Sequence, residues 1–231
     1  MILEHLGESG LRLSLGAEVL CFDPPRPVEG PVVLTWSEQE RVSGARVSPG
    51  PLAGHPDNLR FIQREGAALV PGQSTNLGPF TVRTFAYAPI PYAVPAEAVR
   101  KTLSAMRSPS LAYRRLRHTL RRPGDPPLVV ELTLGTTRAV HLGQSLHRFA
   151  DVTTLAAELE GADLAICGTD FEDELATGRL LHAFRARQNV VADLVGTVRQ
   201  RLGLPTRPLA LTLREAPQGT HLLRPGELLR L

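Results

Sequence analysis

Cysteine, lysine and tryptophan are scarce in this chain of 231 residues. The two cysteines, Cys21 and Cys167, lie in apolar strand-like runs, which predicts buried, reduced thiols and a cytoplasmic protein. Lys101 is the sole lysine, so arginine supplies nearly all of the positive charge, although the net charge is only +3. Guanidinium groups favour bidentate contacts with phosphate and carboxylate groups, so this bias matters wherever arginines cluster.

Long apolar runs are also missing. No stretch reaches the roughly 18 apolar residues that indicate a transmembrane helix, so we expect no membrane span. The N-terminus lacks a basic region followed by an apolar one, which argues against a secretory signal. Phosphate-loop, Rossmann and Cys-x-x-Cys zinc signatures are absent. A hydrophobic fraction of 42% is enough for a core, and we expect one domain over residues 1–231.

Hydrophobic periodicity predicts mostly strands at the start of the chain and mixed elements later. Strands are expected at 11–15, 19–22, 32–35, 67–70, 80–85, 128–132, 138–142, 164–167, 208–213 and 220–223. Helices are expected at 59–65, 95–107, 108–120, 151–159, 172–187 and 189–202, and 72–76 is expected to be a polar loop. This order favours an α+β fold in which sheets pack together with helices outside, although periodicity alone leaves other α+β arrangements open.

The segment from Val32 to Arg41 carries the most specific pattern. An apolar strand ends at Thr35 and runs into a polar turn that contains Trp36, Glu38, Glu40 and Arg41. This frame resembles the metallo-β-lactamase superfamily, in particular its small sugar-lactonase-like hydrolases. In that family the strand and threonine precede His-x-His-x-Asp-His, whose side chains hold one or two metals that activate water.

Other landmarks of the same family follow in the expected order. They are His5 to Gly10, with Glu8 where the family has histidine; Phe22-Asp23-Pro24; His141 to Ser145, with Gln144 in the slot of the metal-bridging aspartate; and the hairpin from Leu222 to Leu228. The resemblance implies a four-layer αββα sandwich. It also identifies the remnant metal-site positions as Trp36, Glu38, Glu40, Arg41, Gln144 and Asp23.

The contents of these slots predict a degenerate site. Trp36 and Arg41 are not zinc ligands, and none of the seven histidines lies in a slot that matches a ligand. Without its ligands a site loses both the charge that lowers the pKa of bound water and the template that orients it. We therefore expect a pseudoenzyme with no catalytic residue, metal or other cofactor, which acts by binding or assembly. Asp23 has a structural role in any case, because an aspartate before proline can bond backbone amides.

An alternative is a metal-dependent hydrolase with an atypical site. Carboxylates of Asp23, Glu38 and Glu40, with the amide oxygen of Gln144 and the carboxylate of Asp170, suit a hard divalent cation such as Mg²⁺. Arg41 argues against this site, because a guanidinium would compete for the same carboxylates. A Ser145–His147–Asp151 triad is disfavoured because Gly-x-Ser-x-Gly is absent, and thiol catalysis is disfavoured because apolar surroundings raise a thiol pKa.

A further alternative is nucleic-acid or phosphate binding by an arginine-rich helical segment at about 95–122. Arg114, Arg117 and Arg121 share one face of the expected helix. Tyr113 is interleaved and could stack on a base. The apolar side of the same segment could instead pack against the body of the protein or against a second subunit in a homo-oligomer. The sequence names no other partner.

Overall fold

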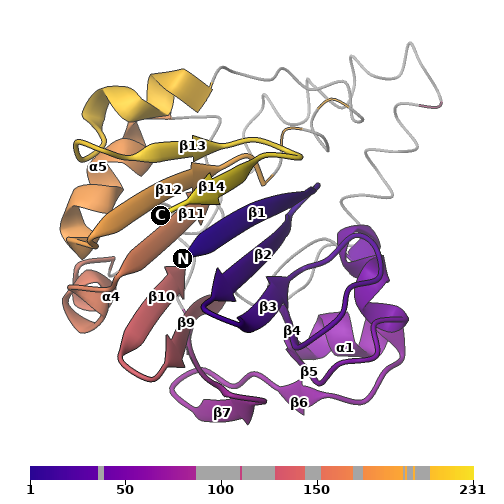
Figure 1. Ribbon diagram of the computed structural model, residues 1–231. Coiled ribbons are helices and arrows are strands. Elements are labelled where there is room, and N and C mark those ends of the chain that lie inside the picture. Colours follow the sequence, from indigo (N-terminus) through magenta and orange to yellow (C-terminus); the bar gives the residue numbers. More distant parts are fainter. Residues whose placement is uncertain are drawn as a thin grey trace.

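The computed structural model describes residues 1–35, 39–86, 110, 128–143, 152–168, 174–194, 196, 200 and 209–231. Within these ranges the chain forms two mixed β-sheets of seven strands each, with helices on their outer faces (Figure 1). The two termini lie next to each other, and the amino group of Met1 donates a hydrogen bond to the carbonyl of Leu231 at 3.2 Å.

The first sheet is built mainly from the N-terminal part of the chain. Its order is β14-β1-β2-β3-β4-β5-β6. Neighbours are antiparallel from β14 to β3 and parallel from β3 to β6. The strands are β1 Ile2–Gly7, β2 Gly10–Leu15, β3 Glu18–Phe22, β4 Val32–Leu34, β5 Leu52–Gly54, β6 Ala67–Ala68 and β14 Leu228–Arg230.

The second sheet has a matching pattern. Its order is β13-β12-β11-β10-β9-β8-β7. Neighbours are antiparallel from β7 to β10 and parallel from β10 to β13. The strands are β7 Ser74–Leu77, β8 Phe80–Ala86, β9 Leu128–Leu134, β10 Thr137–His141, β11 Leu164–Gly168, β12 Gln188–Ala192 and β13 His221–Leu223.

Three hydrophobic clusters define four layers. The largest lies between the sheets and is formed by alternate residues of strands from both, such as Leu13 and Phe22 from one and Val130 and Ile166 from the other. Helices α4 Val152–Leu159 and α5 Glu174–Phe184 cover the outer face of the second sheet. Helix α1 Pro56–Ile62 and the 3₁₀ segment η1 Gln39–Arg46 cover the outer face of the first. The expected αββα sandwich is therefore confirmed.

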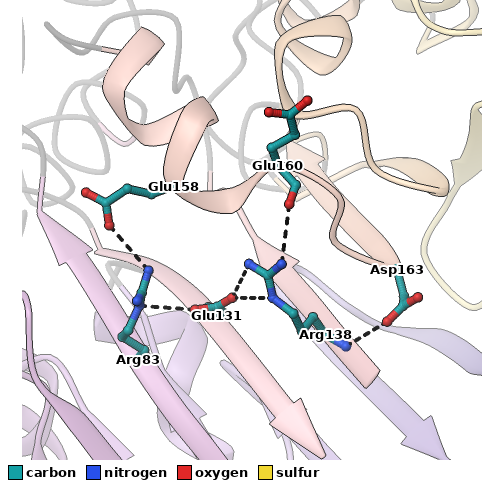
Figure 2. Close-up of polar contacts among 6 residues, drawn as sticks. All are labelled: Arg83, Glu131, Arg138, Glu158, Glu160 and Asp163. Carbon is teal, nitrogen blue, oxygen red and sulfur yellow. Dashed lines mark hydrogen bonds and ion pairs between the residues drawn. The ribbon is translucent and has the colours of Figure 1, made fainter. Parts of the chain in front are cut away.

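A charged network fixes α4 to the second sheet (Figure 2). The buried carboxylate of Glu131 in β9 lies between two guanidinium groups, 3.1 Å from Arg83 Nε and 2.7 Å from a terminal nitrogen of Arg138. Arg83 also reaches Glu158 near the end of α4, and Arg138 reaches the carbonyl of Glu160 beyond it. Since the pairs bridge β8, β9 and β10 to the helix end, they hold the outer layer in register with the sheet.

Several predicted elements are wrong. The stretch predicted as helix 189–202 begins as the buried strand β12, because a short β-branched run between two parallel neighbours reads the same as a helix face. The strand predicted at 208–213 is a 3₁₀ segment, η4 Leu209–Glu215. Residues 74–76 of the polar loop predicted at 72–76 belong to the edge strand β7, and β1 and β5 were not predicted.

Two other expectations concern the middle of the chain and the membrane. The helices predicted at 95–107 and 108–120, and with them the arginine-rich segment, lie outside the described residues apart from Ser110. Among the described helices, none combines the length and the apolar character needed to cross a membrane.

Candidate functional site

The carboxyl ends of strands from both sheets meet at one end of the sandwich, which we call the mouth. In the first sheet, β3 and β4 end there at Phe22 and Leu34. In the second sheet, the parallel strands β10, β11 and β12 end there. The ring of Phe22 stacks on the imidazole of His141, the last residue of β10, with centroids 4.7 Å apart and planes inclined by 27°. The ends of the two sheets therefore face each other.

Asp23, which was predicted to be a remnant metal-site position, has a structural role at the mouth. Its backbone has a positive φ of 42°, and the residue is almost fully buried. Its Oδ1 accepts a hydrogen bond from the amide of Thr35 at 2.8 Å, and its Oδ2 accepts one from the Thr35 hydroxyl. The structural role predicted for Asp23 is thus observed, but this amide belongs to Thr35 after β4, whereas the prediction was a bond to an amide in a turn.

The end of β4 is secured from the other side by α1. Asn58 on this helix donates a hydrogen bond from Nδ2 to the carbonyl of Thr35 at 2.5 Å. His55 caps the same helix, because its Nδ1 accepts a hydrogen bond from the amide of Asp57 at 3.2 Å. The His55 amide also donates to the carbonyl of Leu34 at 2.9 Å. These bonds fix the backbone at the point where the remnant motif begins.

His5 connects the two sheets at the mouth. Its Nε2 lies 2.8 Å from the carbonyl oxygen of Asp193, which follows β12, and its Nδ1 accepts a hydrogen bond from the amide of Gly7 at 3.1 Å. Burial lowers the pKa of His5 below its usual 6.5, and this effect outweighs the opposing influence of Asp193 and Glu227. Both ring nitrogens are therefore engaged by the backbone.

His141 is the third buried histidine of the mouth and differs from the other two. Within the described part of the chain, neither of its ring nitrogens has a hydrogen-bond partner. Burial lowers the pKa of His141 to about 4 and outweighs the opposing influence of its own backbone. The imidazole is therefore neutral at pH 7.

The described side chains at the mouth do not fit a catalytic metal. In the regions that the structure describes, no three His, Cys, Asp or Glu side chains converge as a cation would require. His5 and Asp23 already use both of their side-chain ligand atoms in bonds to Gly7, Asp193 and Thr35. A metal that binds His5 would have to displace one of its two contacts, because each ring nitrogen has a single ligand position.

The remaining predicted site residues are placed only in part. Trp36, Glu38 and Gln144 lie outside the described residues, as do Asp170 and the triad Ser145, His147 and Asp151. Glu40 and Arg41 belong to η1, but the description does not extend to their side chains. Arg114, Arg117 and Arg121 also lie outside the described residues. Cys21 and Cys167 are both buried and form no disulfide, as the sequence predicted.

Sequence reasoning did not find that three buried histidines share the mouth. Each of them is adjacent to an apolar strand end: His5 lies near the end of β1, His55 follows β5 and His141 ends β10. That position was the available signal, because the ends of parallel strands meet at one edge of a sheet. By contrast, His182 and His221 are exposed.

Comparisons with known proteins agree with this geometry. No protein-family model matches the sequence, and no curated protein matches it. Among solved structures, the chain is similar to the metallo-β-lactamase fold protein YhfI from Bacillus subtilis, at 15% identity and a TM-score of 0.59 over 99% of both chains. It is also similar to isothiocyanate hydrolase from Delia radicum gut bacteria, at 11% identity and a TM-score of 0.53, over 100% of this chain and 99% of that one.

A third structure extends the comparison beyond hydrolases. CmlA, a diiron β-hydroxylase from Streptomyces venezuelae, matches at 9% identity and a TM-score of 0.62, over 100% of this chain and 54% of that one. The chain therefore has the metallo-β-lactamase fold. At these identities the comparisons establish the fold alone, because structures that share it differ in activity.

Proposed function

We propose that this protein is a non-hydrolytic member of the metallo-β-lactamase fold that acts by binding or assembly in the cytoplasm. The observation that carries the proposal is the use of His5, His55 and Asp23 for hydrogen bonds that hold the mouth together. In a hydrolytic site the side chains at this end must present free ligand atoms to a metal. Here His5, His55 and Asp23 instead form bonds within the protein that hold strand ends and turns in place.

Residue identities at the remnant positions support the same conclusion. Trp36 and Arg41 occupy slots that require a neutral imidazole or a carboxylate, and a guanidinium stays protonated in proteins, so it does not bind a cation. The joint replacement matters more than any single one, because one missing ligand could be tolerated whereas the loss of the set removes the charge that activates water. The two free, buried cysteines support a reducing compartment.

The experiment is an activity panel in which metal is the variable. Protein purified without chelator is incubated with phosphodiester and lactone substrates, as isolated, after EDTA treatment, and with added Zn²⁺, Mn²⁺ or Mg²⁺. The proposal expects no turnover that EDTA abolishes or that an added metal induces. Turnover restored by one of these metals would support the alternative hydrolase, whose carboxylate site includes Asp23, Glu38 and Glu40.

Binding and assembly are then measured directly. Size-exclusion chromatography with light scattering over a range of concentrations reports self-association. Titration with a labelled oligonucleotide tests the arginine-rich segment, in which Arg114, Arg117 and Arg121 are the expected contacts. If these arginines contact phosphates, the affinity for the oligonucleotide should fall steeply with added salt. An affinity that does not change with salt concentration would exclude phosphate contact.

A further inference from the structure

We propose that His5 is a proton-sensitive latch of the β1–β2 turn. Its neutral imidazole holds the Gly7 amide through Nδ1, and the protonated imidazole releases that amide while Nε2 stays bonded to the carbonyl of Asp193 after β12. This inference goes beyond the proposed function, because it concerns how the β1–β2 turn is held at the mouth. It holds whether or not the mouth contains a ligand.

The two contacts of the ring assign its tautomer. The Gly7 amide can only donate, so Nδ1, at 3.1 Å, must present its lone pair. The proton of the neutral ring therefore resides on Nε2, which donates to the carbonyl oxygen of Asp193 at 2.8 Å. One side chain thus satisfies a donor of the first sheet and an acceptor of the second, and it does so only in this protonation state.

A second proton would break one of these contacts. Protonated Nδ1 becomes a donor that faces the Gly7 N–H, so the bond is lost and the two groups repel each other. The bond supports the start of the turn, where Gly7 at the end of β1 and Glu8, the first turn residue, have positive φ values of 96° and 49°. The left-handed conformation is unfavourable for a glutamate and persists where surrounding contacts impose it.

The charges around His5 set the direction of its titration. Asp193 and Glu227 favour the protonated ring, but burial disfavours it more strongly, so the pKa of His5 lies below 6.5. Both carboxylates already have partners: Asp193 accepts from the amide of Gly196 at 2.6 Å, and Glu227 accepts from the amide of Arg224 at 2.8 Å.

Two further charged residues, Glu8 and Arg26, lie near the β1–β2 turn, and neither is among the charges that shift the pKa of His5. The residue opposite His5 in β2 is the apolar Leu11. Glu8 lies in the turn, and Arg26 donates to the carbonyl of Leu6 at 3.3 Å. Because burial lowers the pKa of His5, the latch is closed at neutral pH and opens as the pH falls below the ordinary histidine pKa of 6.5.

The test is an NMR titration of the ¹⁵N-labelled full chain from about pH 7.5 to about pH 4.5, which brackets the ordinary histidine range. Long-range ¹H–¹⁵N spectra give the tautomer and pKa of each imidazole, and the Gly7 amide reports the hydrogen bond. We expect the Nε2–H tautomer of His5 at the upper pH. The Gly7 amide proton should shift upfield with the midpoint of His5, while core amides keep their folded positions.

Two variants separate the two contacts. His5→Asn places an amide oxygen where Nδ1 stands and should keep the Gly7 amide in its bonded position at every pH. His5→Gln places an amide nitrogen near Nε2 and should leave the Gly7 amide released at every pH. Because His141 is also buried, the titration is repeated with His141→Phe, which should leave the Gly7 midpoint unchanged.

Several outcomes would overturn the latch. They are an Nδ1–H tautomer at neutral pH, a Gly7 amide that does not follow His5, a Gly7 titration that persists in His5→Asn, and global unfolding before the Gly7 amide shifts. If a variant fails to fold, the wild-type tautomer and the shared midpoint of His5 and Gly7 still decide the question.

Discussion

Replacing His141 with phenylalanine should remove most of the acid sensitivity that this residue gives to the fold. The imidazole is almost fully buried, stacks on Phe22 and has no hydrogen-bond partner among the described residues. Phenylalanine keeps a ring against Phe22 but cannot be protonated. Because the substitution removes buried polar atoms that lack hydrogen-bond partners, the free energy of unfolding at pH 7 should decrease only slightly.

The magnitude follows from the two pKa values of His141. In the unfolded chain the group has the ordinary value of 6.5, and in the folded chain burial lowers it to about 4. Between these values the unfolded chain binds the proton and the folded chain does not, so the free energy of unfolding decreases as pH falls. At 1.36 kcal/mol per pH unit, the loss attributable to His141 between pH 7 and pH 5 is about 2 kcal/mol.

The assay is urea unfolding followed by far-ultraviolet circular dichroism at pH 7, 6 and 5. The wild type should lose about 2 kcal/mol more than His141→Phe over this range, and His141→Leu, included in case the larger ring is poorly accommodated, should behave like His141→Phe. Contributions shared by all three proteins, including that of His5, cancel in the difference. Equal losses in the wild type and both variants would refute the assignment of a neutral, buried His141.

Three further predictions concern residues away from the mouth. Glu131→Gln should lower the free energy of unfolding by about 2 kcal/mol, because it leaves Arg83 and Arg138 without their shared carboxylate. Glu158→Gln, which removes an exposed ion pair, should lower it by less than about 1 kcal/mol. Equal decreases for the two variants in thermal or urea unfolding would contradict the role of the network. Arg64→Met should lower the free energy of unfolding by about 2 kcal/mol, because Arg64 donates to the carbonyls of Ala45 in η1 and of Ser48 and Gly50 after it. Arg60→Met, which removes an exposed pair with Asp57, is the matched control and should change this free energy little. Both cysteines should resist alkylation at pH 8 in the native protein and react fully in denaturant, because Cys21 and Cys167 are buried and burial raises the pKa of Cys21 to about 11. Rapid labelling of the folded chain would contradict this prediction, because it would show that the thiols are accessible.

The sequence predicted the fold better than it predicted individual elements. Alternating or continuous apolar runs correctly located strands such as β2, β3, β9, β10 and β11. The landmarks around Asp23 and Thr35 supplied the architecture, which periodicity had left open. Strand β12 was mistaken for a helix because Val190 and Val191 fit both a buried strand and a helix face, and only pairing with β11 and β13 decides between them.

The site was predictable in its contents but not in its contacts. The resemblance predicted that Trp36 and Arg41 stand in ligand slots, and the sequence predicted a structural role for Asp23. It did not show that His5 joins the sheets or that His141 is buried against Phe22, because both contacts link residues more than a hundred positions apart. Such contacts depend on how the two sheets face each other, which no local pattern encodes.

The central claim is that the mouth does not hold a catalytic metal, and metal content tests it most directly. Elemental analysis is performed on the full chain purified without chelator. A variant carrying Trp36→His, Glu38→His, Glu40→Asp and Arg41→His, the residues of the complete motif, is measured beside it. We expect the wild type to carry well under about 0.1 equivalents of any transition metal and the variant to carry more, since uptake requires deprotonated ligands in the correct number. A stoichiometric metal that remains with the wild-type chain through purification would contradict the account.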